Sequence, residues 1–500
     1  MGELTEDMKP FADLHRGPER RYLWVLLGLL CASLALRLAF ATRWSQPLVN
    51  DAAHFNALAK TLLHHGRFPS AYRSPGYPAF VAMIYGVFGE SPAAVFMVQA
   101  IVATAAVGLV YLLGVDLFGP ERRRLALAAA ALVGLNPEIA AYSGILLREA
   151  ISVPLILLAA WLGVRMLTRS WQYGVLLGLS VIALAYVRTE GCLPVAVMIG
   201  AGLFHRCWRR RIVAGGLTAA SVMMAGTLPW VLYCARSRGY VGMQHALAPC
   251  LFSRVWYLSP EGSVEPALRR YTMAAVARSG LTARETRRFT VPPLLVKGLA
   301  RDDVRAEVAL YDKLGRIAGE NVIRCWPRYL ADSADHFRAL MGGYWLFWWK
   351  GYWEVPPLRG NLRDGQWGVA ATKLINRVLW PMGVVLLTIV SLRCLWRQGD
   401  SAAWPVTLLL AGVAAGLTLV SLTVCGDPRL RLPYDGIFYL PVCHGFGVAV
   451  RPWTKITARS TIGEKMGLES PPKRVTAFEH PVRESIRSHV KGIVVKSKAT

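Results

Sequence analysis

Charged residues are scarce in this sequence of 500 residues, and acidic ones are the scarcest. Only 18% of the chain is charged, with 31 Asp and Glu against 57 Lys and Arg, while 54% is hydrophobic and the mean hydropathy is +0.36. A water-soluble core cannot absorb that much apolar surface. The apolar residues gather in uncharged windows of roughly 15 to 24 residues, a length that crosses about 30 Å of hydrocarbon. These windows exclude a soluble globular protein and predict helices, because backbone polar groups inside a bilayer must be paired internally.

Cysteine pairs with the spacing of a metal site are also lacking. The nine cysteines include no C-x-x-C pair, so neither a metal nor a disulfide framework is indicated. The formal charge of +26 does not predict a nucleic-acid partner, since no nucleic-acid-binding module accompanies it. Basic residues instead flank the apolar windows and fill the C-terminal tail, a placement that the positive-inside rule and anionic headgroups explain. Membrane lipids are the expected partners.

The pattern predicts an all-α polytopic membrane protein with about ten transmembrane helices. Arginine clusters fall on alternate connections together with both termini, which indicates that these parts are cytoplasmic. The protein is therefore expected in the inner (plasma) membrane, with a large extracytoplasmic loop. The expected spans are 22–41, 92–113, 125–141, 149–165, 171–187, 190–204, 212–234, 376–393, 403–424 and 434–450.

This topology divides the chain into a short cytoplasmic start, two membrane modules, an outer domain and a tail. Arginines before the first span resemble the start of a signal peptide, but the many later spans favour an uncleaved signal anchor. The basic tail is expected to be flexible. The parts are 1–21 (cytoplasmic), 22–234 (N-terminal transmembrane module, with the outer loop 42–91), 235–375 (extracytoplasmic loop domain with interfacial helices), 376–450 (C-terminal transmembrane helices) and 451–500 (cytoplasmic tail).

Three segments outside the spans also carry structural signals. Residues 77–88 are apolar but too short to span comfortably, which predicts an interfacial or re-entrant helix after the breaking sequence Ser74-Pro75-Gly76-Tyr77-Pro78. Apolar residues at near-helical spacing predict a charged helix over 302–340. The aromatic segment 344–353 suits the headgroup region, either as an anchor or as a contact for a lipid substrate.

Two acidic residues on the outer face are candidates for chemistry, because charges near a membrane are costly unless they are paired or hydrated. Asp51 opens a helical stretch, although a helix N-cap would explain it equally. Glu149 stands at the outer mouth of the fourth span, where the helix dipole alone would stabilise it.

Arginines on the outer face form a second group of candidates. Arg188 lies in a tight hairpin with Glu190, and the two could do no more than pair with each other. Arg429 and Arg431 precede the last span, against the positive-inside tendency. Such a pair can hold a phosphate by charge-assisted hydrogen bonds, and solvated surface arginines are the alternative.

Several short motifs follow one another along residues 20–450. They are Asp51, Arg73-Ser74-Pro75 through Phe88-Gly89, Leu117-Phe118-Gly119, Asn136-Pro137, Leu147-Arg148-Glu149, Pro229-Trp230, Trp326-Pro327-Arg328-Tyr329-Leu330 and Asp427 to Pro433. Their order resembles the GT-C superfamily of polyprenyl-phosphate-dependent glycosyltransferases, in particular bacterial members similar to protein O-mannosyltransferases and the aminoarabinose transferase of lipid A. The sequence departs from that pattern at Asp51, which lacks an adjacent second acid, at Tyr233, where an arginine is usual, and at Leu430, where a tyrosine is common.

The resemblance implies a GT-C-like bundle that moves a hexose or pentose, with inversion, from a polyprenyl-phosphate donor to a protein, glycan or lipid acceptor on the outer face. Asp51 would take the proton of the acceptor hydroxyl, Glu149 would position acceptor or sugar, and the late arginine pair would stabilise the departing phosphate. The candidate substrate- and phosphate-binding residues are His54, Arg73, Tyr77, Arg188, Arg429 and Arg431.

No cofactor is firmly implied. Some members of the superfamily use a divalent cation and others do not, and the few clustered carboxylates favour a mechanism without a metal. Two other functions remain as alternatives. A transporter or flippase of lipid-linked substrates would have ionisable residues or broken helices near the bilayer midplane and two related halves. A non-enzymatic membrane scaffold would leave the outer acids free to vary.

Overall fold

The computed structural model describes residues 18–203, 209–256, 258, 264–279, 295, 303–341, 365, 374, 379–423 and 430–465. The described residues form helices and connections, with no strand among them. The aromatic segment 344–353 and the tail beyond residue 465 lie outside this set. Residues 1–449 form one compact unit and residues 450–500 another, which contains the end of helix α23 (Asp435–Lys465). All the predicted spans and the loop region 235–375 belong to the first unit, apart from residue 450 at the end of the last span.

Among the described residues, five helices are long and apolar enough to cross a membrane. They are α3 (Pro18–Arg43), α6 (Pro92–Phe118), α9 (Glu149–Thr168), α12 (Arg209–Tyr233) and α22 (Ala403–Thr423). The other expected spans fall on shorter or less apolar helices, α10 (Tyr173–Val187), α11 (Leu193–Gly202), α21 (Trp380–Gln398) and α23. The helical membrane fold is confirmed, and the number of ten spans stays a prediction.

The expected span 125–141 is broken in the structure. It consists of α7 (Arg123–Gly134) and α8 (Pro137–Ala141), in two helical pieces bent by 47°. The Asn136 side chain accepts hydrogen bonds from the first backbone N–H groups of α8, and Pro137 cannot continue a helix from before it. Buried Arg37 of α3 donates to the Gly134 carbonyl at 3.1 Å, which supplies a partner for the end of α7.

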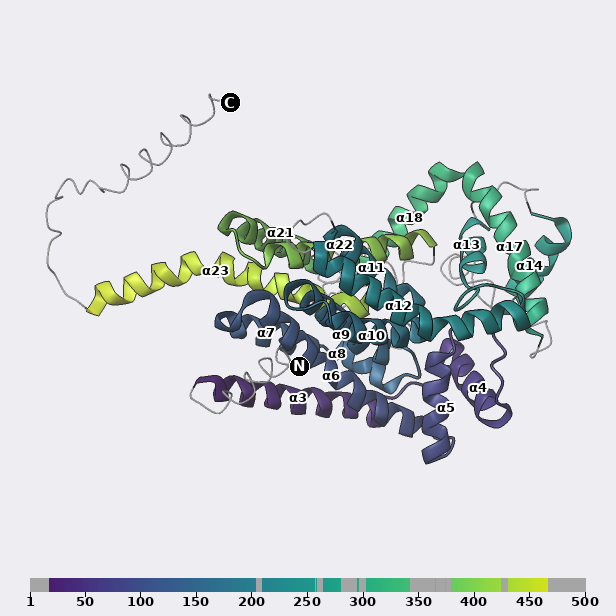
Figure 1. Cartoon of the computed structure of the whole chain (residues 1–500), viewed down its shortest axis with the longest axis horizontal. Coiled ribbons are helices and arrows are strands. Elements are labelled where there is room, and N and C mark those ends of the chain that lie inside the picture. The colour runs from purple at the N-terminus through teal and green to yellow at the C-terminus, as the bar shows by residue number, and fades with distance from the viewer. Residues whose placement is uncertain are drawn as a thin grey trace, which may run out of the picture. The chain divides into compact units, whose positions relative to one another are not determined.

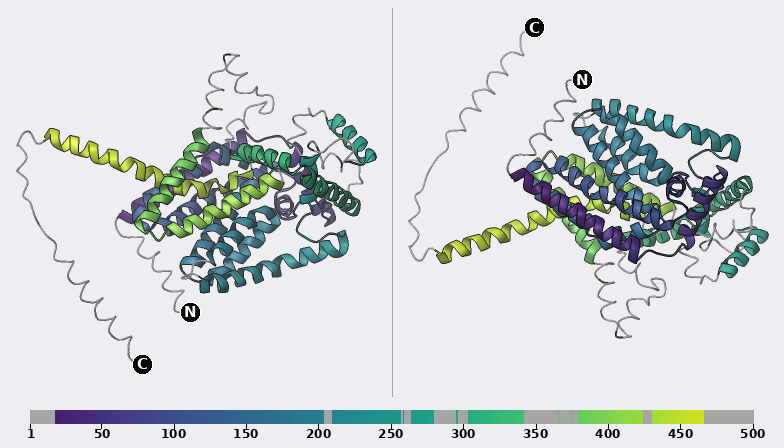
Figure 2. Two further views of the ribbon diagram at one scale, coloured as in Figure 1. Left: turned by 90° about the horizontal axis from the view of Figure 1, so that it is seen from above. Right: turned by 90° about the horizontal axis from the view of Figure 1, so that it is seen from below.

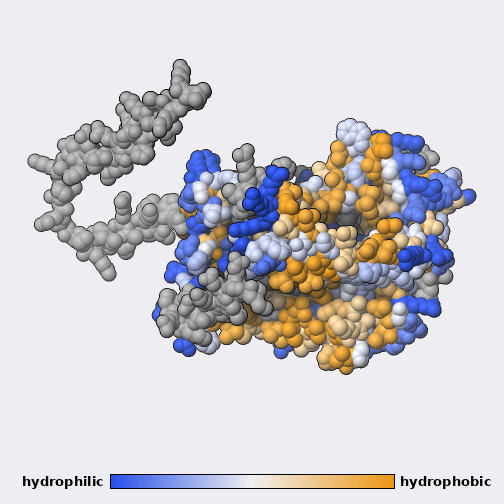
Figure 3. Space-filling model, in the orientation of Figure 1, coloured by the Kyte–Doolittle hydropathy of each residue, from blue (hydrophilic) through white to orange (hydrophobic). Residues whose placement is uncertain are grey.

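The helices pack side by side around α6, which contacts α3, α7 and α9, while α10 packs on α12 and α11 on α22 (Figures 1 and 2). At one end of this bundle lie α4 (Asn50–His65), α5 (Gly76–Phe88), α13 (Leu247–Val255), α14 (Pro266–Ser279) and α17 (Val304–Arg324). On the face shown in Figure 3, hydrophobic residues spread over the middle of the bundle and hydrophilic residues gather at its ends. This distribution suits a bundle with its middle in lipid.

The long helix expected over 302–340 is present close to its expected bounds, but it is divided in two. It belongs to the loop region 235–375, which we call the outer loop. Helix α17 ends at Arg324 and α18 (Trp326–Met341) follows after Cys325. Pro327 explains the break, because it has no backbone N–H to continue the hydrogen bonds of α17 and its ring clashes with the carbonyl four residues earlier. The apolar spacing in α17 was informative, since Val308, Tyr311 and Leu314 are buried.

Replacing Gly76 by alanine is expected to lower the free energy of unfolding by about 1–3 kcal/mol, because a Cβ there would lie 2.6 Å from the Tyr186 carbonyl carbon and oxygen of α10. The backbone on both sides would have to shift. Gly108→Ala in α6 is the matched control, since nothing lies within 4 Å of its added methyl group. Thermal unfolding in detergent should rank Gly76→Ala well below both Gly108→Ala and wild type. Equal unfolding temperatures would contradict the close approach of α5 to α10.

Candidate active site

Asp51 and Arg73 form an ion pair at the end of the bundle where α4, α5 and α13 lie. Asp51 lies in the first turn of α4, and Arg73 lies in the non-helical connection between α4 and α5. The guanidinium of Arg73 also lies over the rings of Phe55 and Tyr72, each 4.8 Å from its carbon. The alternative interpretation of Asp51 as an N-cap is wrong, because the cap position is Val49 and it makes no side-chain hydrogen bond to the helix.

Tyr77 is fully buried and joins α5 to the middle of the bundle. Its hydroxyl donates to Gln99 Oε1 of α6 at 2.5 Å, and the Gln99 amide donates to the Ile145 carbonyl at 2.9 Å. The Tyr77 ring meets Phe55 edge to face, with 4.9 Å between the centroids. The structure thus places this sequence-predicted contact residue behind the ion pair, where it supports Phe55.

His54 lies beside the same ion pair on α4. Burial lowers its pKa to about 4, the positive charge of Arg73 acts in the same direction, and Asp51 opposes both. The imidazole is therefore neutral at pH 7, so it can accept or donate a hydrogen bond to a sugar hydroxyl.

The shifted pKa of His54 predicts a pH dependence of stability. Its folded-state pKa lies below the ordinary value of 6.5, so the unfolded chain binds more protons between pH 4 and 6.5. The stability that the neutral imidazole contributes is complete above pH 6.5 and is lost as the pH falls toward 4, with a slope of up to about 1.4 kcal/mol per pH unit. His54→Gln should flatten this part of the unfolding profile. An unchanged slope would show that His54 titrates normally in the folded protein.

A second group of charges lies where α9 begins and α10 ends. Glu190 Oε1 accepts a hydrogen bond from Arg148 Nη2 at 2.7 Å and forms an ion pair with Arg188 Nε at 3.2 Å. Arg188 Nη1 lies 3.7 Å from Glu149 Oε1. Arg188 is fully buried and Glu149 is 3% exposed. The expected pairing of Arg188 with Glu190 is present, but it is part of a network of four charges that joins two helices.

The ion pair and the charge network are close enough to influence each other. Burial lowers the pKa of Arg148, Glu190 opposes this, and the positive charges of Arg188 and Arg73 add to it. Burial also raises the pKa of the Cys250 thiol to about 11, a value to which Arg73, Glu190 and Arg148 all contribute. Residues from four separate parts of the chain therefore meet in one polar region.

Cys250 and Tyr72 belong to this region, although sequence reasoning missed them. The Tyr72 hydroxyl lies 3.5 Å from Cys250 Sγ, which brings α13 of the outer loop against the connection that carries Arg73. The position of Tyr72 beside Arg73 was a usable signal. Nothing in the sequence around Cys250 indicated its place.

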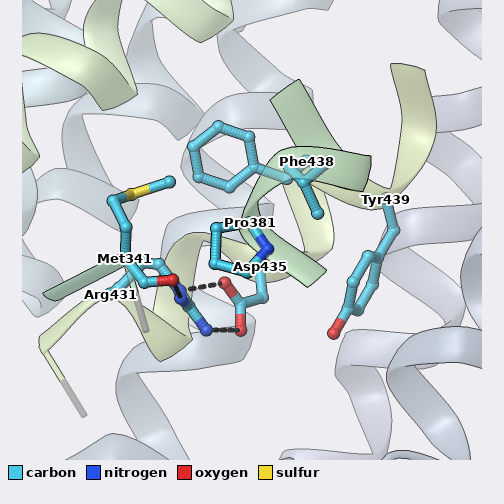
Figure 4. Close-up of a pocket in the computed structure, with 7 residues that line it drawn as sticks. Met341, Pro381, Arg431, Asp435, Phe438 and Tyr439 are labelled. Carbon is cyan, nitrogen blue, oxygen red and sulfur yellow. Dashed lines mark hydrogen bonds and ion pairs between the residues drawn. The ribbon is translucent and has the colours of Figure 1, made fainter. Parts of the chain in front are cut away.

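Arg431 lies apart from the ion pair, in the wall of a small pocket (Figure 4). Its Nε lies 2.8 Å from Asp435 Oδ1 and its Nη1 donates to the Met341 carbonyl at 2.6 Å. With 3% exposure, Arg431 is not the solvated surface residue of the alternative interpretation. The remaining lining residues are Pro381, Val384, Phe438 and Tyr439.

The late arginine segment nevertheless reaches the charge network. The Leu430 carbonyl accepts a hydrogen bond from Arg188 Nη2 at 3.3 Å. Arg429 lies outside the described residues, so its predicted phosphate contact stays a prediction. Within the described part of the chain, no three His, Cys, Asp or Glu side chains come together as a metal site.

Similarity to known proteins agrees with this geometry. The sequence profile of the dolichyl-phosphate-mannose-protein mannosyltransferase family matches residues 72–233, which include Arg73, Glu149 and Arg188. Among solved structures, the archaeal oligosaccharyltransferase AglB from Archaeoglobus fulgidus, in complex with an inhibitory peptide and a dolichol-phosphate, superposes with a TM-score of 0.50 over 90% of this chain, at 14% identity. The chain has the GT-C fold. The GT-C-like fold expected from the motifs is thereby confirmed.

The match to AglB covers 52% of that protein, so this GT-C chain spans about half the length of its structural neighbour. ArnT from Cupriavidus metallidurans, bound to undecaprenyl phosphate, is also similar, with a TM-score of 0.38, 16% identity and coverage of 90% of this chain and 82% of ArnT. No curated protein matches the sequence significantly. Asp51, His54 and Arg431 lie outside the segment that the family profile matches.

Proposed function

We propose that this protein transfers a sugar from a polyprenyl-phosphate donor to an acceptor at the non-cytoplasmic face of the plasma membrane, with both termini in the cytoplasm. The observation that carries the proposal is the Asp51–Arg73 ion pair, which lies next to a buried network of arginines and carboxylates at one end of a bundle of apolar helices. A carboxylate at that end can meet both a lipid-linked donor and a water-soluble acceptor. The mannosyltransferase profile and the GT-C fold support the same reaction class.

The chemistry needs a base and a positive charge for the leaving phosphate. Asp51 accepts the proton of the acceptor hydroxyl while the hydroxyl oxygen attacks the anomeric carbon, and the bond from that carbon to the phosphate oxygen breaks on the opposite side. Polyprenyl phosphate leaves as an anion, and the anomeric configuration inverts. An acceptor that is itself a phosphate arrives ionised, in which case Asp51 orients it and takes no proton.

Arg73 and Glu149 have complementary tasks in this scheme. Arg73 lies beside Asp51 and is the nearest positive charge for the phosphate, with Arg188 behind it in the charge network. Glu149 Oε2 is buried and has no hydrogen-bond partner among the described residues. It can therefore accept a hydrogen bond from a hydroxyl group of the sugar or of the acceptor. Arg431 forms an ion pair with Asp435 in the pocket of Figure 4. In this scheme Arg431 binds the phosphate together with Arg429 only after its ion pair with Asp435 has separated.

The test is a transfer assay with the protein in lipid nanodiscs. Polyprenyl-phosphate sugars are offered one at a time with peptide, glycan and lipid acceptors, and mass spectrometry follows release of polyprenyl phosphate. The proposal expects turnover of one donor that stops when the acceptor is withheld. In proteoliposomes, movement of an intact lipid-linked sugar between leaflets without turnover would replace the proposal by the transporter alternative.

Sidedness is expected to follow from the same placement. In a background with Cys31 replaced by serine, cysteines at Val241 and Ile323, which are 81% and 77% exposed, should react with a membrane-impermeant maleimide from the periplasmic or external side. A cysteine at exposed Gln172, in the connection between α9 and α10, should react only after the membrane is opened. Labelling of all three from one side would contradict the topology.

A further inference from the structure

The connection that carries Arg73 is buried although it forms no helix. We call residues 67–75, between α4 and α5, the Arg73 segment. Its members Phe68, Ser70, Ala71 and Ser74 are all buried, like Arg73 itself. Buried backbone N–H and C=O groups need hydrogen-bond partners, and an irregular segment cannot supply them by itself. The position of Arg73 therefore depends on whichever groups bind this backbone.

The outer loop supplies hydrogen-bond partners for both the backbone N–H and the backbone carbonyl of Ala71 in this segment. Glu307 Oε2 of α17 accepts a hydrogen bond from the Ala71 backbone N–H at 3.0 Å. The backbone N–H of His245 donates to the Ala71 carbonyl at 2.6 Å. The sequence separation between Ala71 and Glu307 is 236 residues, so this contact exists only after the outer loop has docked.

Further contacts fix the rest of the segment to the same outer loop. Arg238 Nη1 donates to the Ser70 carbonyl at 2.9 Å, and its Nη2 donates to the Phe68 carbonyl. The Ser74 hydroxyl lies 2.9 Å from Gln244 Oε1. Arg238 thus holds the backbone before Arg73 and Gln244 holds the side chain of the residue after it, while Asp51 holds the side chain of Arg73 itself.

Glu307 is the most informative of these partners, because it is an acid at 6% exposure. An isolated buried carboxylate is costly, and a neutral side chain would pack beside α13 without that cost. The carboxylate is stabilised here by the hydrogen bond from the Ala71 N–H, and it lies in the first turn of α17, where the helix dipole also favours an acid. Charge-assisted hydrogen bonds of this kind fix a backbone position more firmly than neutral ones.

We propose that Glu307 is a positioning residue that sets the place of Arg73, and through it of Asp51, by binding the Ala71 backbone from the outer loop. This inference rests on the proposed sugar transfer, in which Arg73 and Asp51 act. It gives the outer loop a task in the reaction that is separate from binding an acceptor. Glu307 touches neither donor nor acceptor in this scheme.

The experiment compares Glu307→Ala, Glu307→Gln and Glu320→Ala in the transfer assay. Glu307→Ala should lower kcat by about 10²-fold, because displacement of about 1 Å in an active site costs that much, while KM for the donor changes less. Glu307→Gln retains an oxygen that accepts from Ala71 N–H and should stay within about 3-fold of wild type. Glu320 is exposed on the same helix, and its replacement should have no effect.

Two further measurements separate positioning from a general loss of folding. Hydrogen exchange should speed up in peptides covering 67–75 in Glu307→Ala and stay unchanged in peptides of α6. In an Arg73→Gln background, Glu307→Ala should cause little additional loss, because both changes act through the same side chain. Unchanged exchange at 67–75, full activity of Glu307→Ala, or fully additive losses would each overturn the positioning role. A wild-type protein that transfers no sugar would instead overturn the proposed function.

Discussion

Asp51→Asn is expected to lower the rate of sugar transfer to a hydroxyl acceptor by roughly 10²- to 10⁴-fold, the contribution typical of a general base. The amide is nearly the same size as the carboxylate but cannot take the proton of the attacking hydroxyl. It also leaves Arg73 without the negative charge that it contacts in the structure. The rate is measured as release of polyprenyl phosphate at saturating donor, so that a change in donor binding is not mistaken for a change in chemistry.

The matched control for this variant is Asp335→Asn. Asp335 lies on α18 with 71% of its side chain exposed, and its ion pair with Arg338 is on the surface, so its replacement should leave transfer unchanged. Normal transfer by a normally inserted Asp51→Asn protein would remove Asp51 from the catalytic role. If the loss is small with a phosphate acceptor and large with a hydroxyl acceptor, Asp51 acts as a base only in the second case.

Arg188→Met is expected to have the largest effect on stability, a loss of about 3–5 kcal/mol, because it removes one partner from a buried group of charges. Glu149 would be left buried with no positive charge in contact, and the Leu430 carbonyl would lose its donor. Thermal unfolding in detergent and the yield of folded protein measure the effect. Sugar transfer should fall together with the folded fraction and also within it, since the network lies beside Asp51.

Two comparisons make the Arg188 result specific. Arg316→Met, on the exposed side of α17, should leave the unfolding temperature unchanged. Adding Glu149→Leu to Arg188→Met should restore part of the lost stability, because both unpaired charges are then gone and Glu190 keeps Arg148. An Arg188→Met protein as stable as wild type would show that the network contributes no net stability.

The sequence predicts the elements of this fold well where the signal is local. The short helix expected over 77–88 is α5, and the helical stretch expected to open at Asp51 is α4. Both predictions depend on the length of the apolar stretch and on residues that break helices, and these signals act within a few positions of the chain. The break in the span over 125–141 is also local, and Asn136-Pro137 was the available signal for it.

The pairing of charges could not be predicted in the same way. Asp51 meets Arg73 and Arg148 meets Glu190, 22 and 42 residues apart, and a buried side chain such as Arg188 touches whichever group the helix packing brings to it. Candidate residues were therefore identified as a set on one face, but their partners were not. Glu307 and Cys250 were missed altogether, because apolar spacing locates a helix but does not show which single acid or cysteine on it will be buried against a distant segment.

The long separation between Ala71 and Glu307 has a consequence for biosynthesis. The first membrane helices leave the ribosome long before α17 is made, so the nascent N-terminal half is inserted with the Arg73 segment still lacking Glu307 and Arg238. Contacts between such distant residues form late in folding. The site to which we assign sugar transfer is thus complete only once the outer loop has been made and has docked, so we expect a truncated or stalled chain to be inactive.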